Sequence, residues 1–184
     1  MLKITDEAKR VLSFWFDDHG PEQWFQKNAH FDQLIEKKFS DLLLQAVQNE
    51  LWPLRDTPEG CLAEIILLDQ FTRNVFRDTP QAFAADPQAL ALAQETVRRQ
   101  FDTKLPPNMR KFLYMPYMHS ESKAVHESCL PLFKSLNDPK TLDFEYQHKA
   151  IIDRFSRYPH RNKILGRKNT PEETEFLKTD GSHF

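Results

Sequence analysis

The amino-acid sequence predicts an all-α protein, an antiparallel array of about eight or nine helices. Helix starts recur as a Thr or Asp directly before Pro, which places an N-cap oxygen ahead of a proline at the first helical position. Five such pairs occur, beginning at Thr57, Thr79, Asp86, Asp138 and Thr170. No run of alternating apolar and polar residues is long enough to predict a sheet. The four glycines are too few and too scattered for a Rossmann or P-loop phosphate site.

The helices can be placed in order along a single domain that spans residues 1–184. Residues 29–49 have apolar side chains at helical spacing. Glu173 completes a capping box with Thr170, and Pro116 should kink or end the helix that contains it. Short connections at 51–56 and 103–107 favour antiparallel neighbours. The predicted helices span residues 5–18, 29–49, 58–77, 80–85, 87–102, 108–118, 121–136, 139–157 and 171–178.

The composition excludes several classes of protein. A net charge of −2 gives no drive toward nucleic acid or an anionic membrane surface. No secretory signal and no apolar run long enough to span a bilayer are visible, so we expect a cytoplasmic protein. Cys61 and Cys129 lie in apolar helical contexts, which favours buried free thiols over a disulfide or a zinc site.

The most informative segment is the predicted helix 58–77, which is apolar almost all round in its first turns and then polar on the same face. At about 100° per residue, Asp69, Gln70, Arg73 and Arg77 share the face of the buried residue Leu62. Burying an unpaired ion costs several kcal/mol, so these groups must pair, find water or line a cavity. One interpretation is an internal ion-pair network that includes the i,i+4 pair of Asp69 and Arg73. The other is an anion clamp with an arginine fork, and Asn74 lies within the same candidate site.

A second polar motif is His119-Ser120-Glu121. Helical periodicity places His119 on the apolar face of its helix, toward the core. A metal site can be drawn with Glu121 and His126, but the two histidines are seven positions apart, whereas helical metal ligands are normally three or four apart. We therefore expect core histidines and predict no metal or cofactor.

The third motif lies near the C-terminus. His148 faces apolar neighbours, Asp153 and Arg157 form another i,i+4 pair, and a loop carrying candidate site residues follows the helix. Lys163, Arg167 and Lys168 are expected to form a solvated basic face. The candidates of this motif are His148, Arg154, His160, Arg161 and Asn162.

These motifs resemble those of a bacterial family known as domain of unknown function 924. The resemblance implies an all-helical fold similar to a tetratricopeptide-repeat superhelix, and it implies no activity. This chain departs from the family pattern at Thr72, where Pro is expected, at Asp78 and Ser156, where Gly is expected, and at His126, near a position where Gln is usual. The resemblance rests on Phe14–Phe16, Trp24-Phe25, Phe31-Asp32, Leu67–Phe71, Arg73-Asn74, Phe76-Arg77, Ala82-Phe83, Asp86, Phe112–Pro116, His119–Glu121, His148, Arg154-Phe155, Pro159–Asn162, Leu165–Arg167 and Thr170.

Three hypotheses for function remain open. In the first, the three motifs converge on a pocket for a small anionic ligand, where a histidine beside carboxylates can act as a general acid or base. In the second, a concave helical surface binds a peptide or protein partner. In the third, the polar groups are only internal ion pairs that fix helix register. A closed cavity favours the first, an open groove the second, and complete mutual pairing without a void the third.

Overall fold

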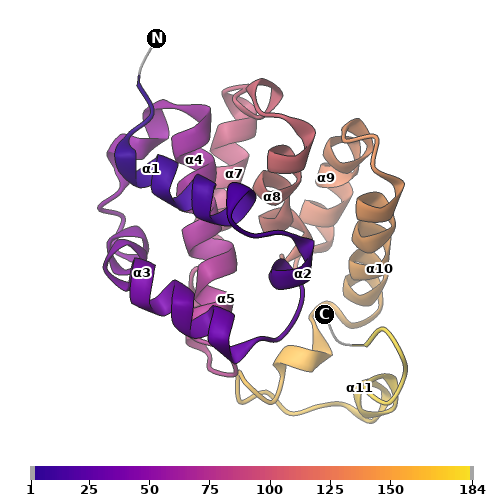
Figure 1. Ribbon diagram of the computed structural model, residues 1–184. Helices are drawn as coiled ribbons and strands as arrows, with labels where there is room; N and C mark the ends of the chain where they lie inside the picture. The colour runs from indigo at the N-terminus through magenta and orange to yellow at the C-terminus, as the bar shows by residue number, and fades with distance from the viewer. Residues whose placement is uncertain (1–2, 183–184) are drawn as a thin grey trace.

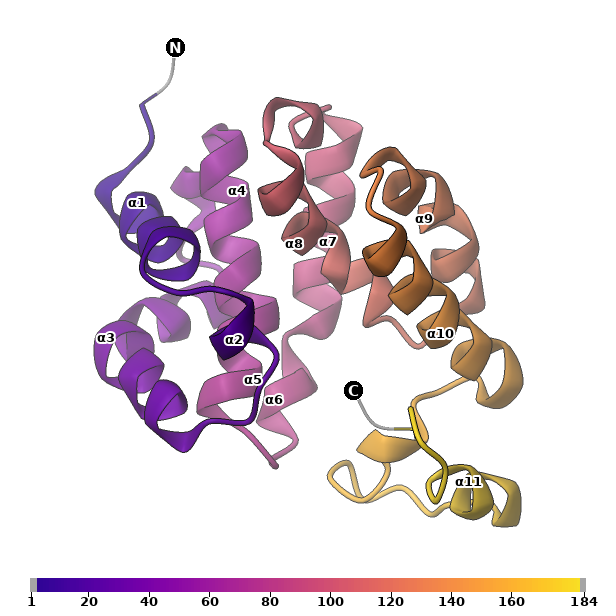
Figure 2. The ribbon, with the colours of Figure 1, turned by 45° about the vertical axis from the view of Figure 1, so that its right-hand side comes forward.

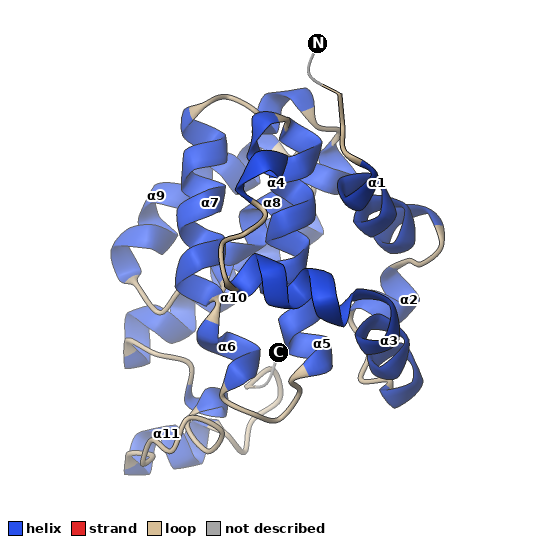
Figure 3. Ribbon diagram, turned by 90° about the vertical axis from the view of Figure 1, so that its left-hand side faces the viewer, coloured by secondary structure: helices blue, strands red, loops and turns tan. Residues whose placement is uncertain are grey.

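The all-α prediction is confirmed by the computed structural model, which describes residues 3–182. Within these residues the chain contains α-, π- and 3-10-helices joined by loops, and no strand (Figure 3). Each predicted helix is present, with ends shifted by a few residues. The α-helices are α1 (Asp6–Leu12), α2 (Pro21–Trp24), α3 (Ala29–Val47), α4 (Pro58–Ile65), α5 (Thr72–Val75), α6 (Gln81–Ala84), α7 (Asp86–Arg98), α8 (Pro107–Met118), α9 (Lys123–Ser135), α10 (Pro139–Phe155) and α11 (Pro171–Phe176).

Shorter helical segments extend or connect these helices. The π-helical segments η1 (Ser13–Asp17) and η3 (Ile66–Phe71) continue α1 and α4 without a break, and α5 continues η3. The 3-10 segments are η2 (Trp52–Asp56), η4 (Asp102–Lys104) and η5 (Pro159–Arg161). The short helix α2 and both π-helical segments were not predicted from the sequence.

Three of the five predicted N-caps are confirmed. Thr57, Asp138 and Thr170 accept hydrogen bonds from the first-turn amides of α4, α10 and α11, and Glu173 completes the capping box of α11. The other two were wrong. Thr79 instead donates its hydroxyl proton to the Phe76 carbonyl, and Asp86 is the first residue inside α7, with a carboxylate that faces two arginines.

The predicted helix ends shift for local reasons. Residues 87–102 were expected to form one helix, but α7 ends at Arg98 and Gln100 has a left-handed φ of 58°. Left-handed residues cannot continue a right-handed helix. Pro116, in contrast, is accommodated within α8, which ends two residues later at Met118.

The long helices pack in the order in which they occur in the sequence. α4 packs against α7, α7 against α8, α8 against α9, and α9 against α10 (Figures 1 and 2). On the other side, α1 packs against α4, and α3 packs against η3 and α5. The segment after α10, with η5 and α11, lies below the array in both views. The chain therefore forms a helical array, and the likeness to a tetratricopeptide superhelix stays a prediction.

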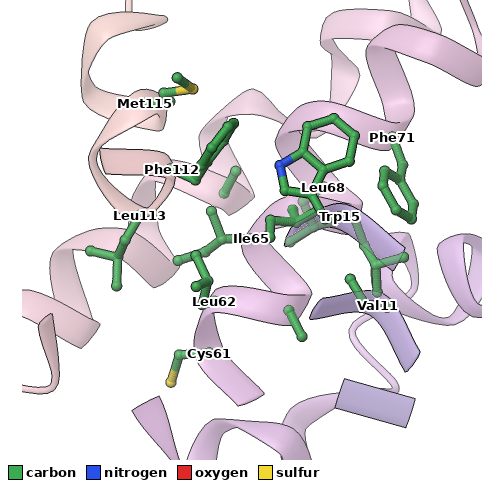
Figure 4. Packing of buried hydrophobic residues seen from close by; sticks show 14 of the residues in the cluster. Val11, Trp15, Cys61, Leu62, Ile65, Leu68, Phe71, Phe112, Leu113 and Met115 are labelled. Carbon is green, nitrogen blue, oxygen red and sulfur yellow. The ribbon is translucent and has the colours of Figure 1, made fainter. Parts of the chain in front are cut away.

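The hydrophobic core surrounds α4 and η3, as predicted from the apolar first turns of the helix expected at residues 58–77. Every residue from 60 to 72 is buried. Figure 4 shows Leu62, Ile65 and Leu68 facing Trp15 and Phe112 from the flanking helices. Burying one such side chain contributes roughly 1.5–3 kcal/mol. The polar residues that follow on the same segment are thus held in place by a large apolar contact.

The π-helical geometry of η3 changes the direction of the side chains that follow. A π-helix makes i→i+5 hydrogen bonds, so each residue advances by a smaller angle than the 100° of an α-helix. Arg77 was predicted to share one helix face with Asp69 and Arg73, but α5 ends at Val75, two residues before it. Arg77 pairs with Asp32 on α3, whereas Arg73 pairs with Asp69 and Asp86.

Candidate functional site

The candidate site is built around Asp69, a fully buried carboxylate on η3. Its Oδ1 lies 2.7 Å from Nδ1 of His119, which follows the last residue of α8. Gln70 donates from Nε2 to Asp69 Oδ2 at 2.6 Å. Because the apolar turns of α4 fix η3 against α8, the core itself sets the separation of this carboxylate and imidazole.

A second carboxylate, Asp86, joins two arginines. Arg73 donates to both of its oxygens, at 2.9 and 3.0 Å, and Arg161 Nη1 donates to Oδ2 at 3.1 Å. Arg73 also donates to the carbonyl of Asp69 at 2.7 Å, and its Nη1 lies 3.4 Å from Asp69 Oδ1, which confirms the i,i+4 pair. Arg161 Nη2 donates to the carbonyl of His119 at 3.1 Å. Asp69, Arg73, Asp86, His119 and Arg161 therefore form one hydrogen-bonded group, called the central cluster below.

A solvent-connected cleft of about 400 Å³ lies against this cluster. His119, Asp86 and Arg161 from the cluster line it, together with Ser120 and Glu121. The rest of the wall is largely apolar and comes from α6, α7, α8 and the segment after η5: Pro80, Phe83, Ala84, Pro87, Leu90, Pro116 and Leu165. An apolar wall with a few convergent polar groups is typical of a small-molecule site.

His119 has hydrogen-bonding capacity left toward a ligand. Its Nδ1 is occupied by Asp69, and within residues 3–182 its Nε2 has no hydrogen-bond partner. The side chain keeps 16% of its surface exposed, although Asp69 behind it is fully buried. A buried carboxylate that orients an imidazole in this way is the arrangement that general acid–base chemistry uses.

Glu121 lines the cleft but is already neutralised. Arg167 donates to both of its carboxylate oxygens, at 2.6 and 2.9 Å, and the Tyr158 amide donates to it at 2.7 Å. The expectation that Arg167 belongs to a solvated basic face was wrong, because it reaches back across the C-terminal segment to this carboxylate. Glu121 consequently offers no uncompensated negative charge to a ligand.

Burial and charge shift several ionisation equilibria here. Burial would raise the pKa of Asp69, but the charges of His119 and Arg73 outweigh it and lower that pKa from 3.8 to about 2. Burial, followed by repulsion from Arg73, lowers the pKa of Arg161. Burial lowers the pKa of His148 to about 3, so its imidazole is neutral at physiological pH.

The structure does not bring all predicted site residues into this cluster. Asn74 and Arg77 both donate to Asp32, with Arg77 making a bidentate pair at 2.6 and 2.8 Å, and together they join α5 to α3. Arg154 lies on the surface and pairs with Glu172 at 2.8 Å. These three residues hold helices together away from the cleft.

The other predicted residues of the C-terminal motif are packed around the cluster or behind it. His148 is buried, with its ring 6.5 Å from that of His119, and donates from Nδ1 to the Phe144 carbonyl. His160 lies against Tyr158, with ring centroids 5.6 Å apart. Asn162 is fully buried and bonds to Arg167 and Asn169. The predicted pair of Asp153 and Arg157 was wrong, because Asp153 pairs with Lys149 and Arg157 with Glu173.

Asp86, Phe83 and Tyr158 contact the arginines of the central cluster and were not among the predicted candidates. Asp86 was interpreted as a helix cap, and nothing local to its sequence shows that two arginines meet its carboxylate. Phe83 and Tyr158 lie under the Arg161 guanidinium, with ring centroids 4.7 and 4.6 Å from its Cζ. Such cation–π contacts hold the arginine in place and become visible only once the fold is known.

Comparisons with known proteins identify the family of the chain. The family model for a bacterial protein of unknown function (DUF924) matches residues 11–181. A solved structure, that of the protein of unknown function ATU0120 from Agrobacterium tumefaciens, is 38% identical, with a TM-score of 0.89 over 93% of this chain and 96% of that one. No curated protein matches the chain. None of the helices between residues 3 and 182 has the length and apolarity needed to cross a membrane. The chain therefore belongs to the DUF924 family of bacterial proteins of unknown function.

Proposed function

We propose that this protein binds a small anionic molecule in the cleft beside the central cluster, with His119 and Arg161 on the polar wall. The observation that carries the proposal is the state of His119. Its Nδ1 is fixed by a buried carboxylate, while its Nε2 has no protein partner within the described residues and its ring lines a cleft of about 400 Å³. An oriented imidazole nitrogen without a protein partner, on the wall of a largely apolar cleft, can hydrogen-bond to a bound ligand.

The charge of the cluster supports an anion. With His119 protonated, the cluster holds the cations Arg73, Arg161 and His119 against the carboxylates Asp69 and Asp86. One positive charge is then left over in a partly buried setting, where charge is screened less than at the surface. A carboxylate or phosphate in the cleft would balance it.

The same geometry is compatible with proton transfer. Asp69 holds the His119 ring in one orientation, so Nε2 could give a proton to, or take one from, a group bound in the cleft. The pairing within the cluster also fits the hypothesis of internal ion pairs, and the opening of the cleft to solvent fits a peptide ligand. The test below separates these possibilities.

The test is a thermal-shift screen with inorganic phosphate, small organic phosphates, di- and tricarboxylates, and short peptides with free C-termini. A ligand at 100 times its Kd should add about 2.7 kcal/mol to the free energy of unfolding. A small anion that stabilises the protein supports the proposal, and stabilisation by peptides alone favours the peptide-binding alternative. No stabilisation by any of these compounds would overturn both.

Two substitutions at His119 locate the ligand. His119→Asn keeps a donor close to the position of Nδ1, facing Asp69, and removes Nε2, whereas Arg154→Ala changes an exposed ion pair distant from the cleft. The Asn variant should lose the stabilisation by the anion and the Arg154 variant should keep it. Full retention in the Asn variant would place the ligand elsewhere.

A further inference from the structure

A second cluster of buried polar side chains joins α9 to α10. His126 and Cys129 lie three positions apart on α9, and Glu145 faces them from α10. All three residues are fully buried. One donor atom from each lies within 4.8 Å of the others, and the closest pair is His126 Nδ1 and Glu145 Oε1 at 2.7 Å.

A hydrogen bond from Nε2 of His126 fixes the orientation of its ring relative to Cys129 and Glu145. Nε2 lies 2.9 Å from the Ser120 carbonyl, which can only accept, so Nε2 carries a hydrogen and donates. Nδ1 therefore faces Glu145 and Cys129. Histidines that bind metal normally donate their other ring N–H to a carbonyl or carboxylate in this way, which orients the lone pair toward the ion.

Glu145 is left incompletely satisfied by the protein. Its Oε1 lies near His126 and accepts from Cys129 Sγ at 3.4 Å, but its Oε2 is buried and has no hydrogen-bond partner within residues 3–182. A buried carboxylate oxygen without a partner is costly, and an ion is one of the ordinary explanations.

We propose that His126, Cys129 and Glu145 bind a divalent transition-metal ion of the zinc type. A thiolate, a carboxylate and a neutral imidazole together carry two negative charges, which a divalent ion balances. A thiolate and an imidazole select zinc-like ions over magnesium or calcium. Tetrahedral coordination places donors roughly 3.3–3.8 Å apart, so small side-chain rotations would bring the three atoms into range.

The ion would join α9 to α10 behind the cleft. His126 Nε2 donates to the carbonyl of Ser120, a residue of the cleft wall. The same nitrogen lies 3.3 Å from the hydroxyl of Tyr158, whose ring packs against the Arg161 guanidinium. The proposal is nevertheless independent of the ligand proposed for the cleft, since its three donors do not line that cleft.

Cobalt is the probe for this site. The full chain is unfolded under reducing conditions with a chelator present, then refolded with and without Co²⁺, so that burial does not prevent entry. We expect one cobalt per chain, a thiolate-to-cobalt charge-transfer band in the near ultraviolet, and displacement of that band by one equivalent of Zn²⁺. Absence of the band from the refolded protein would overturn the proposal.

Matched variants identify the ligands. Cys129→Ser should abolish the charge-transfer band, and Cys61→Ser, which changes the other buried free cysteine, should leave it intact. His126→Gln replaces the proposed imidazole ligand with a neutral amide, and it should weaken cobalt binding by about 10-fold or more while circular dichroism shows the native helix content. An unchanged band in Cys129→Ser, or the loss of the band in Cys61→Ser, would contradict the assignment.

Discussion

Asp69 and His119 are separated by 50 positions in the sequence, yet their Oδ1 and Nδ1 atoms lie 2.7 Å apart. The carboxylate comes from a π-helical segment in the centre of the core, and the imidazole follows the last residue of α8. π-Helical turns are rare and frequently occur at functional sites. The packing of the core therefore fixes Asp69, and Asp69 in turn orients the His119 ring that lines the cleft.

The first prediction concerns the charge of Asp69. Asp69→Asn keeps the shape of the side chain but removes the negative charge that His119 and Arg73 face in a buried setting. Removing one partner of a buried ion pair typically costs 3–5 kcal/mol, so we expect a loss of about 3 kcal/mol in the free energy of unfolding. Urea denaturation of the two proteins measures the difference. Asp6→Asn, which alters an exposed pair with Lys9, should leave the midpoint unchanged.

The second prediction concerns how the contribution of the Asp69 carboxylate to folding stability depends on pH. Burial would raise the pKa of Asp69, but His119 and Arg73 lower it from 3.8 to about 2 in the folded protein. A depressed folded-state pKa stabilises the protein above the unfolded-state pKa, and the stabilisation is lost as the pH falls toward the folded-state value. The difference in Tm between wild type and Asp69→Asn should therefore be constant near pH 5 and shrink between about pH 4 and pH 2. A difference that grows over this range would contradict the assigned direction.

Much of the helical layout could be predicted from the sequence because its signals are local. Apolar spacing in α3 and N-caps such as Thr57 and Thr170 depend only on neighbouring residues. The face presented by α5 could not be predicted, because a π-helical segment changes the rotation per residue and the 100° assumption then fails. The helix also ends at Val75, so Arg77 lies beyond it and pairs with Asp32.

The site was predictable in part for the same reason. The positions of Asp69, which is buried, and of Arg73 and His119, which are half-buried, follow from helical periodicity, because each shares a helix face with apolar residues. Asp86 and Arg161 meet across 75 positions, and that pairing depends on how the C-terminal segment folds back under the array. Pairings over such separations leave no mark in a single sequence.

The third prediction concerns Ser156, the C-cap residue directly after α10. Its φ is 58°, in the left-handed region where a Cβ costs roughly 1–2 kcal/mol, and the family resemblance leads us to expect Gly here. Glycine removes that strain but gains flexibility in the unfolded chain, so Ser156→Gly should stabilise the protein by about 0.5–1 kcal/mol. The measurement is a shift of the urea midpoint to higher concentration. Ser128→Gly, inside α9 with ordinary helical geometry, should shift it to lower concentration.

The fourth prediction separates Arg77 from the ligand site. Arg77→Ala leaves the Asp32 carboxylate without its bidentate partner, although Asn74 still donates to it. Hydrogen bonds to charged groups contribute about 1.5–3 kcal/mol, so we expect a loss of roughly 2 kcal/mol in unfolding free energy. Because Asp32 lies outside both the central cluster and the cleft wall, the stabilisation by an anion should be as large as in wild type. Thermal shifts with and without the anion measure both effects. Loss of the anion response in a folded Arg77→Ala protein would show that the segment after α5 contributes to the site. Arg161→Lys, in contrast, should reduce that response, because a lysine cannot make the two-armed contact with Asp86 and His119.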